Sequence, residues 1–117
     1  MENSQKLKGK VALITGASKG IGAGIAKAYA NQGATVVVNY ASNKNDADKV
    51  VEEITTNGGK AIAIQGNVEK AADVKRIFEE ILKSFGKLDI LVNNAGVYSF
   101  AGIDDITEES FHRMFNI

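Results

Sequence analysis

Short apolar runs alternate along the chain with amphipathic stretches. The runs, which are bounded by glycine or polar residues, are VALI (11–14), ATVVV (34–38), AIAI (61–64) and LDILV (88–92). Continuous apolar runs of this length are typical of parallel strands that are covered on both faces. We therefore predict four strands at these positions.

Amphipathic helices are predicted between the strands. The segment 47–54 has apolar residues at i, i+3, i+4 and i+7, and the segment 74–85 continues the same rule. This spacing gives a helix one buried stripe. The run IAKAYA (25–30) is also typical of a helix. Glycines at positions 33, 58–59 and 86 fall where these helices should end and strands begin.

The order of elements is therefore β-α-β-α-β-α-β, with a further helix starting near Thr107. Right-handed crossovers place such strands in one parallel sheet with helices on both faces. We predict an α/β fold, a Rossmann-type doubly wound sheet of strand order 3-2-1-4, in a single domain over residues 1–117.

The stretch TGASKGIG (15–22) lies between the first strand and the first helix. In a strand-turn-helix unit, glycines permit a tight turn and let the backbone approach a phosphate. Gly16 would permit the turn, while Gly20 and Gly22 would allow close approach and helix packing. The helix N-terminus would offer N–H groups and a positive dipole end. We predict a dinucleotide pyrophosphate site here.

The second strand is followed by Asn39-Tyr40-Ala41-Ser42-Asn43-Lys44, which contains no carboxylate. Cofactors with a free ribose 2′-hydroxyl are usually held by Asp or Glu about 20 residues after the glycines. A 2′-phosphate would instead meet Lys19, the Asn39 amide, Ser42 and, as a further candidate, Lys44. Asp46 is better explained as a charge at the start of the second helix. This pattern favours NADP over NAD.

Charge and composition exclude several functions. Lys plus Arg and Asp plus Glu number 14 each, which argues against nucleic acid or an acidic membrane as partner. The absence of cysteine excludes disulfides, thiolate metal ligands and cysteine nucleophiles. No apolar run approaches the length of a membrane span, and the N-terminus lacks a signal core. We expect a cytoplasmic protein without a metal site.

The sequence resembles the classical short-chain dehydrogenase/reductase family. TGASKGIG matches the family turn T-G-x-x-x-G-x-G, and NNAG (93–96) after the fourth strand matches a second family motif. The resemblance implies that NNAG lines the nicotinamide side and that Asn94 with Thr15 ties the central strands together. It also implies that Gly66-Asn67-Val68, after the third strand, forms the adenine pocket. The family usually has Asp where this chain has Asn67. The residues expected to contact NADP(H) are Gly16, Ser18, Lys19, Gly20, Ile21, Gly22, Asn39, Tyr40, Ser42, Asn67, Val68, Asn94, Ala95 and Gly96.

Within the family, the sequence is most similar to the 3-oxoacyl-acyl-carrier-protein reductases, with glucose and polyol dehydrogenases as the alternative. The resemblance implies reduction of a carbonyl substrate in fatty acid biosynthesis, and a substrate linked to acyl carrier protein is the candidate. A non-catalytic nucleotide-binding or self-associating fragment is the alternative of another class.

The resemblance also implies a catalytic Ser, Tyr and Lys, the last two spaced Y-x-x-x-K. Tyr29 and Tyr40 lie inside the cofactor-binding region, and Tyr98 is followed at that spacing by Gly102. We expect no catalytic residue in this chain. We expect it to be the N-terminal half of a reductase, inactive alone, because the apolar stripe of the final helix (Phe111, Met114 and Phe115) still continues at the chain end. An uncovered stripe and an open sheet edge would favour a homo-oligomer.

Overall fold

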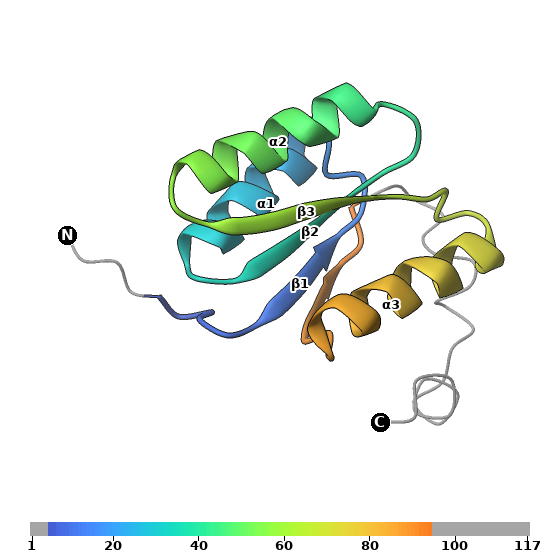
Figure 1. Ribbon diagram of the computed structural model, residues 1–117. Coiled ribbons are helices and arrows are strands. Elements are labelled where there is room, and N and C mark those ends of the chain that lie inside the picture. The colour runs from blue at the N-terminus through green and yellow to red at the C-terminus, as the bar shows by residue number, and fades with distance from the viewer. Residues whose placement is uncertain (1–4, 95–117) are drawn as a thin grey trace.

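Residues 5–94 are described by the computed structural model of this chain, and they form a four-stranded parallel sheet with three helices (Figure 1). The strands are β1 (Val11–Ile14), β2 (Thr35–Tyr40), β3 (Lys60–Gln65) and β4 (Ile90–Val92), and the helices are α1 (Gly20–Asn31), α2 (Lys44–Thr56) and α3 (Ala71–Phe85). The strand order is β3-β2-β1-β4. The predicted α/β class and strand order 3-2-1-4 are confirmed. The helix predicted near Thr107 lies outside the described residues.

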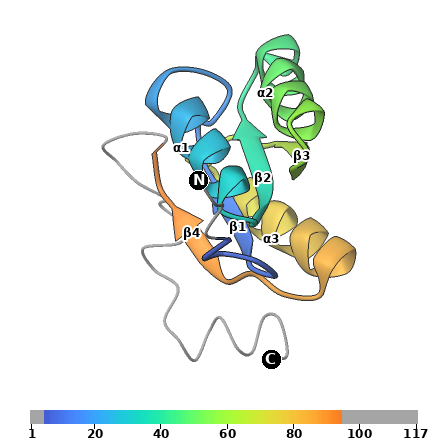
Figure 2. The same cartoon turned by 90° about the vertical axis from the view of Figure 1, so that its left-hand side faces the viewer.

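The helices cover the two faces of the sheet. Helices α1 and α2 pack on one face and α3 packs on the other, as the two views show (Figures 1 and 2). Alternate residues of the central strands point to opposite cores. Ala12 and Ile14 of β1 belong to the core under α1 and α2, whereas Val11 and Leu13 belong to the core under α3.

Burial follows the position of each strand in the sheet. All four residues of β1 are buried, and so are five of the six residues of β2. Strand β3 lies at an edge, and only Ile64 within it is fully buried. The two central strands are therefore covered on both sides, whereas the apolar runs of β3 and β4, at the two edges, are covered less completely.

Two predicted strand boundaries lie two residues from the observed ones. Strand β2 continues through Asn39 and Tyr40, because both residues are buried and pair with β3. Strand β4 begins at Ile90, two residues later than predicted. Leu88 instead packs against the core under α3, and the backbone and carboxylate of Asp89 both bind Val11.

Capping residues set the ends of the helices. The Oδ1 atom of Asn43 accepts a hydrogen bond from the Asp46 N–H at 3.1 Å and caps α2. Asp46 lies in the first turn of α2, as predicted. Gly86 ends α3 in the left-handed conformation, with φ of 78°.

Asp89 fixes the start of β4 against β1. Its Oδ2 atom accepts a hydrogen bond from the Val11 N–H at 2.8 Å, and its own N–H donates to the Val11 carbonyl at 2.9 Å. Lys87 Nζ lies 3.3 Å from the same carboxylate. The hydrogen bond from Val11, reinforced by Lys87 and opposed by partial burial, holds the pKa of Asp89 below its usual value.

We expect Asp89→Asn to lower the free energy of unfolding at pH 7 by about 1 kcal/mol, since a charged acceptor is replaced by a neutral one. The pKa of Asp89 is lower in the folded chain than in the unfolded chain. The stabilisation by its carboxylate is therefore complete above the unfolded-state pKa of about 4, and it is lost as the pH falls through the folded-state pKa. Urea unfolding between pH 3 and 7 measures it. A deficit that persists undiminished at pH 3 would contradict this account, and Asp48→Asn, on an exposed ion pair, is the control.

Candidate nucleotide site

The glycine-rich turn lies at the carboxyl end of the parallel sheet. It connects β1 to α1, and the segments that leave β2, β3 and β4 lie beside it. In open α/β sheets, ligands bind in the crevice outside the carboxyl ends of the strands. The predicted pyrophosphate turn is therefore at the edge where this fold places ligands.

Three glycines of the turn have different physical roles. Gly16 and Gly20 have φ of 60° and 64°, which side-chain-bearing residues rarely adopt. Gly22 is constrained by space. A Cβ atom at Gly22 would lie well inside van der Waals distance of both the Asn94 Nδ2 atom and the Gly16 carbonyl oxygen. Gly22 thus lets α1 approach the end of β1.

Thr15 and Asn94 join the turn to the end of β4. The Asn94 N–H donates to Thr15 Oγ1 at 2.9 Å, and Asn94 Nδ2 donates to the Gly16 carbonyl at 3.1 Å. Thr15 is fully buried. The structure confirms the contact between Thr15 and Asn94 that the family resemblance implied.

The N-terminus of α1 has an unneutralised positive end. Its N-cap residue, Lys19, makes no side-chain capping bond, and the first turn contains no acidic residue. Such a terminus has unsatisfied N–H groups that suit an anion. Lys19 and Gly20 are exposed, Ser18 is partly buried, and Ile21 is 76% exposed. This is the only described helix with neither an acidic residue in its first turn nor a side-chain cap.

Asn39 has a different environment from the predicted one. It is 2% exposed, and its Nδ2 atom donates to the carbonyls of Ile64 and Gly66 at 3.3 and 3.2 Å. Its Oδ1 atom accepts from the Gly16 N–H at 3.3 Å, and its carbonyl accepts from the Ala17 N–H at 2.9 Å. Both amide hydrogens are used inside the protein. The prediction that this amide donates to a 2′-phosphate is therefore corrected: Asn39 holds the turn.

The linker between β2 and α2 carries the remaining candidates for a 2′-phosphate. Ser42 is exposed, whereas Tyr40 is 9% exposed and belongs to the core under α1 and α2. Lys44 Nζ donates a hydrogen bond to Asp48 Oδ2 at 2.7 Å, and the two side chains form an ion pair. This contact raises the pKa of Lys44. Ser42 and Lys19 are the two predicted 2′-phosphate donors that form no such ion pair with any of residues 5–94.

Tyr40 and Lys44 have the spacing Y-x-x-x-K of the family's catalytic pair. Tyr40 ends a strand and is buried, whereas Lys44 begins the following helix and is exposed. The two residues are therefore no catalytic pair. The expectation that this chain contains no catalytic residue stays a prediction, because residues 95–117 are outside the described part.

The predicted adenine segment follows β3. The Asn67 N–H donates to Asp73 Oδ2 at 2.8 Å, and Asn67 Oδ1 accepts from the Glu69 N–H at 2.9 Å. Val68 is 8% exposed and packs in the core under α3. The two hydrogen bonds fix the segment after β3, and the Val68 side chain is directed into the core. Ala95 and Gly96, the last two predicted contacts, lie outside the described residues.

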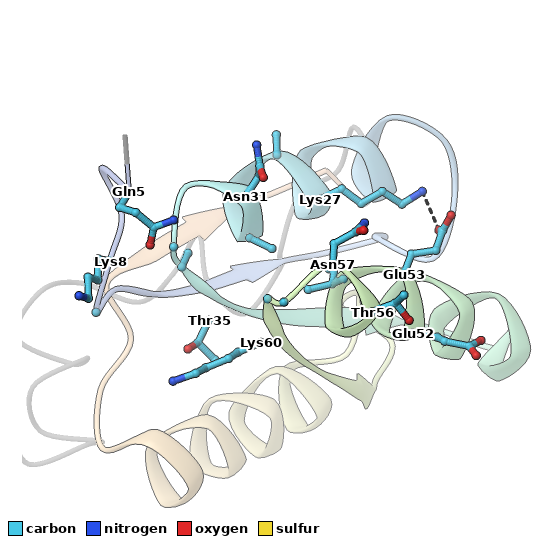
Figure 3. A pocket seen from close by; sticks show the side chains of 18 residues that line it. Gln5, Lys8, Lys27, Asn31, Thr35, Glu52, Glu53, Thr56, Asn57 and Lys60 are labelled. Atoms are coloured by element: carbon cyan, nitrogen blue, oxygen red, sulfur yellow. Dashed lines mark ion pairs between the residues drawn. The ribbon is translucent and has the colours of Figure 1, made fainter. Parts of the chain in front are cut away.

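A separate hollow of about 1020 Å³ opens at the opposite edge of the sheet (Figure 3). It lies where α1 and α2 end and where β2 and β3 begin, and it is lined by residues such as Asn31, Asn57 and Lys60. Lys27 and Glu53 within it form an ion pair at 2.7 Å between the two helices. None of the predicted nucleotide contacts lines this hollow.

Comparison with known proteins identifies the family. The family model for short chain dehydrogenases matches residues 10–117. The chain belongs to the short-chain dehydrogenase family. It is 59% identical over 112 residues to an uncharacterised oxidoreductase of Methylorubrum extorquens, covering 96% of this chain and 45% of that protein. It is 48% identical to a hydroxynaphthalene reductase-like protein of Metarhizium guizhouense, covering 99% of this chain and 43% of the relative.

Solved structures of short-chain dehydrogenases have the same fold. A Burkholderia cenocepacia enzyme in complex with NADP matches with a TM-score of 0.75 and 41% identity, over 96% of this chain and 46% of that one. A metagenomic short-chain oxidoreductase in complex with NADP matches with a TM-score of 0.73 and 38% identity, over 78% and 41%. The chain thus spans less than half the length of these relatives.

Two further findings concern metal sites and membrane-spanning helices. Among residues 5–94, no three or more His, Asp or Glu side chains are grouped so as to hold a metal ion. No helix in this described part is long and apolar enough to cross a membrane.

We expect Gly22→Ala to lower the free energy of unfolding by about 1–3 kcal/mol, because the added methyl displaces the Asn94 amide or the Gly16 carbonyl. Gly24→Ala is the matched control on the same helix: no atom lies within 4 Å of its added Cβ. It should stabilise the chain by about 0.5–1 kcal/mol. Urea unfolding measures both, and equal effects of the two variants would contradict the packing role of Gly22.

Proposed function

We propose that this chain is the nucleotide-binding half of an NADP(H)-dependent short-chain reductase. Two neighbouring features carry the proposal: the uncapped N-terminus of α1 follows the glycine turn, and the end of β2 has no carboxylate. The first feature suits a pyrophosphate, and the second suits a 2′-phosphate. Related structures in complex with NADP support the same cofactor.

The pyrophosphate would be bound by the backbone at the start of α1. Gly20, Ile21 and Gly22 supply N–H groups of the first turn, and the helix dipole favours the negative charge there. The exposed Ile21 side chain offers apolar surface beside this site. Gly16 and Ala17, held by Asn39, keep the turn in position before the ligand arrives.

The 2′-phosphate would be recognised by Lys19 and Ser42. Lys19 contributes a positive charge and Ser42 a hydroxyl donor, and both residues are exposed. An acidic residue at the end of β2 would repel the phosphate, and none is present between Asn39 and Asn45. Asn39 contributes indirectly, through the turn.

NADPH supplies the hydride in a carbonyl reduction, and this chain would bind and orient its adenosine and pyrophosphate groups. We propose that the residues that act on the carbonyl belong to a longer protein, so that this chain alone is inactive. A 3-oxoacyl thioester on acyl carrier protein, as in fatty acid biosynthesis, is the first candidate substrate, and it is supported by the sequence resemblance alone. A hydroxynaphthalene-type substrate is the second candidate, because a 48% identical relative carries that name.

Self-association also stays a proposal. In the described part, β4 pairs with β1 on one side, and Leu91 of β4 is 37% exposed. A strand edge with unpaired backbone groups favours addition of another strand, from the same protein or a second copy.

We expect the chain to bind NADPH more tightly than NADH. The Ser42→Asp variant should have an affinity for NADPH about tenfold lower or more, with its affinity for NADH unchanged. A carboxylate near a 2′-phosphate costs roughly 1–4 kcal/mol at surface dielectric constants. Ser42→Asn is the neutral control and should retain the preference. Dissociation constants from NADPH and NADH fluorescence measure it. Equal affinity of the unmodified chain for both cofactors would contradict the proposed function.

A further inference from the structure

The linker from β2 to α2 is short and fixed at both ends. It contains Ala41, Ser42 and Asn43. Just before it, the Tyr40 carbonyl accepts a hydrogen bond from the Gly66 N–H at 2.9 Å, and at its end Asn43 caps α2. A linker of three residues between two fixed points has few conformations. Its remaining freedom depends on what holds Ala41 and Ser42.

Gln65, the last residue of β3, holds Ala41. Its Nε2 atom donates a hydrogen bond to the Ala41 carbonyl at 2.8 Å. This bond crosses from one strand end to the linker that follows the neighbouring strand, 24 residues away in sequence. The carbonyl group of Ala41 is thereby directed toward β3.

Arg76 of α3 fixes the orientation of the Gln65 amide. Its Nη2 atom donates to the Gln65 carbonyl at 2.9 Å and lies 3.4 Å from Gln65 Oε1. The guanidinium is itself paired with Glu80 at 3.0 Å and lies 4.0 Å from Asp73. A cation beside Oε1 requires that Nε2, the donor, faces Ala41, and it strengthens that donor.

We infer that Gln65 is a positioning residue for recognition of the cofactor 2′-phosphate. Resting on the proposed function, this inference assigns selectivity to a residue that need not touch the ligand. Gln65 keeps the Ala41 carbonyl oxygen, a partial negative charge, turned toward β3, and it holds the adjoining Ser42 in one place. Without this bond, the linker can rotate and present that oxygen to the phosphate, which repels it. NADH, which has no 2′-phosphate, is insensitive to this rotation.

The test compares the NADPH and NADH dissociation constants of the unmodified 117-residue chain with those of the Gln65→Leu and Gln65→Met variants. Both variants remove the Nε2 donor, and neither adds a charge near the phosphate. Loss of this one exposed hydrogen bond predicts about a three- to tenfold weaker NADPH affinity, with NADH affinity changed by less than about twofold. Gln32→Leu is the matched control, since Gln32 follows α1 at the opposite edge of the sheet and should leave both constants unchanged.

The outcomes separate this inference from the proposed function. A selective loss of NADPH affinity in both Gln65 variants supports the inference. An equal loss of affinity for both cofactors shows that Gln65 has a merely structural role, and it overturns the inference. An unchanged preference for NADPH in both variants overturns the inference as well. If the unmodified chain has no preference for NADPH, or binds neither cofactor, the proposed function fails first and the inference fails with it. If Gln65→Leu does not fold, the neutral variant Gln65→Met decides between these outcomes.

Discussion

The carboxyl edge of the sheet depends on the buried amide of Asn39. A primary amide placed out of water is stable only when its donors and acceptor are all satisfied, because each unmet group costs about 1–3 kcal/mol. Asn39 meets this condition through the backbone of Ile64, Gly66 and Gly16 at once. The segments after β1 and β3 must therefore both be in place around the end of β2.

This constraint explains why the glycine turn can be ordered before a ligand binds. Its first residues donate N–H groups to Asn39, and on the other side Asn94 donates to the Gly16 carbonyl. Gly22 lets α1 begin against these two contacts. A preorganised turn loses little conformational entropy when it binds an anion. The chemistry of the site is thus mainly backbone chemistry, and side chains act by holding the backbone.

The sheet order and helices could be predicted from the sequence because apolar runs, helical periodicity and glycines are local signals. The roles of Asn39, Asp89 and Gln65 could not be predicted from the sequence. A polar residue at a strand end has the same local pattern whether it faces solvent or is buried, so Asn39 was wrongly predicted to donate to a phosphate. Asp89 was predicted within a strand, but it binds Val11, 78 residues away. Gln65 acts across 24 residues, and no periodicity signals such a contact.

Nitrogen-15 chemical-shift mapping of the chain during an NADPH titration tests the central claim most directly. The account predicts saturable shifts at the amides of Gly20, Ile21 and Gly22 and at Ser42, at the carboxyl edge of the sheet. Amides around the opposite hollow, such as those of Asn57 and Lys60, should not move. Shifts confined to that hollow, or none at saturating NADPH, would contradict a nucleotide site built on the turn that Asn39 holds.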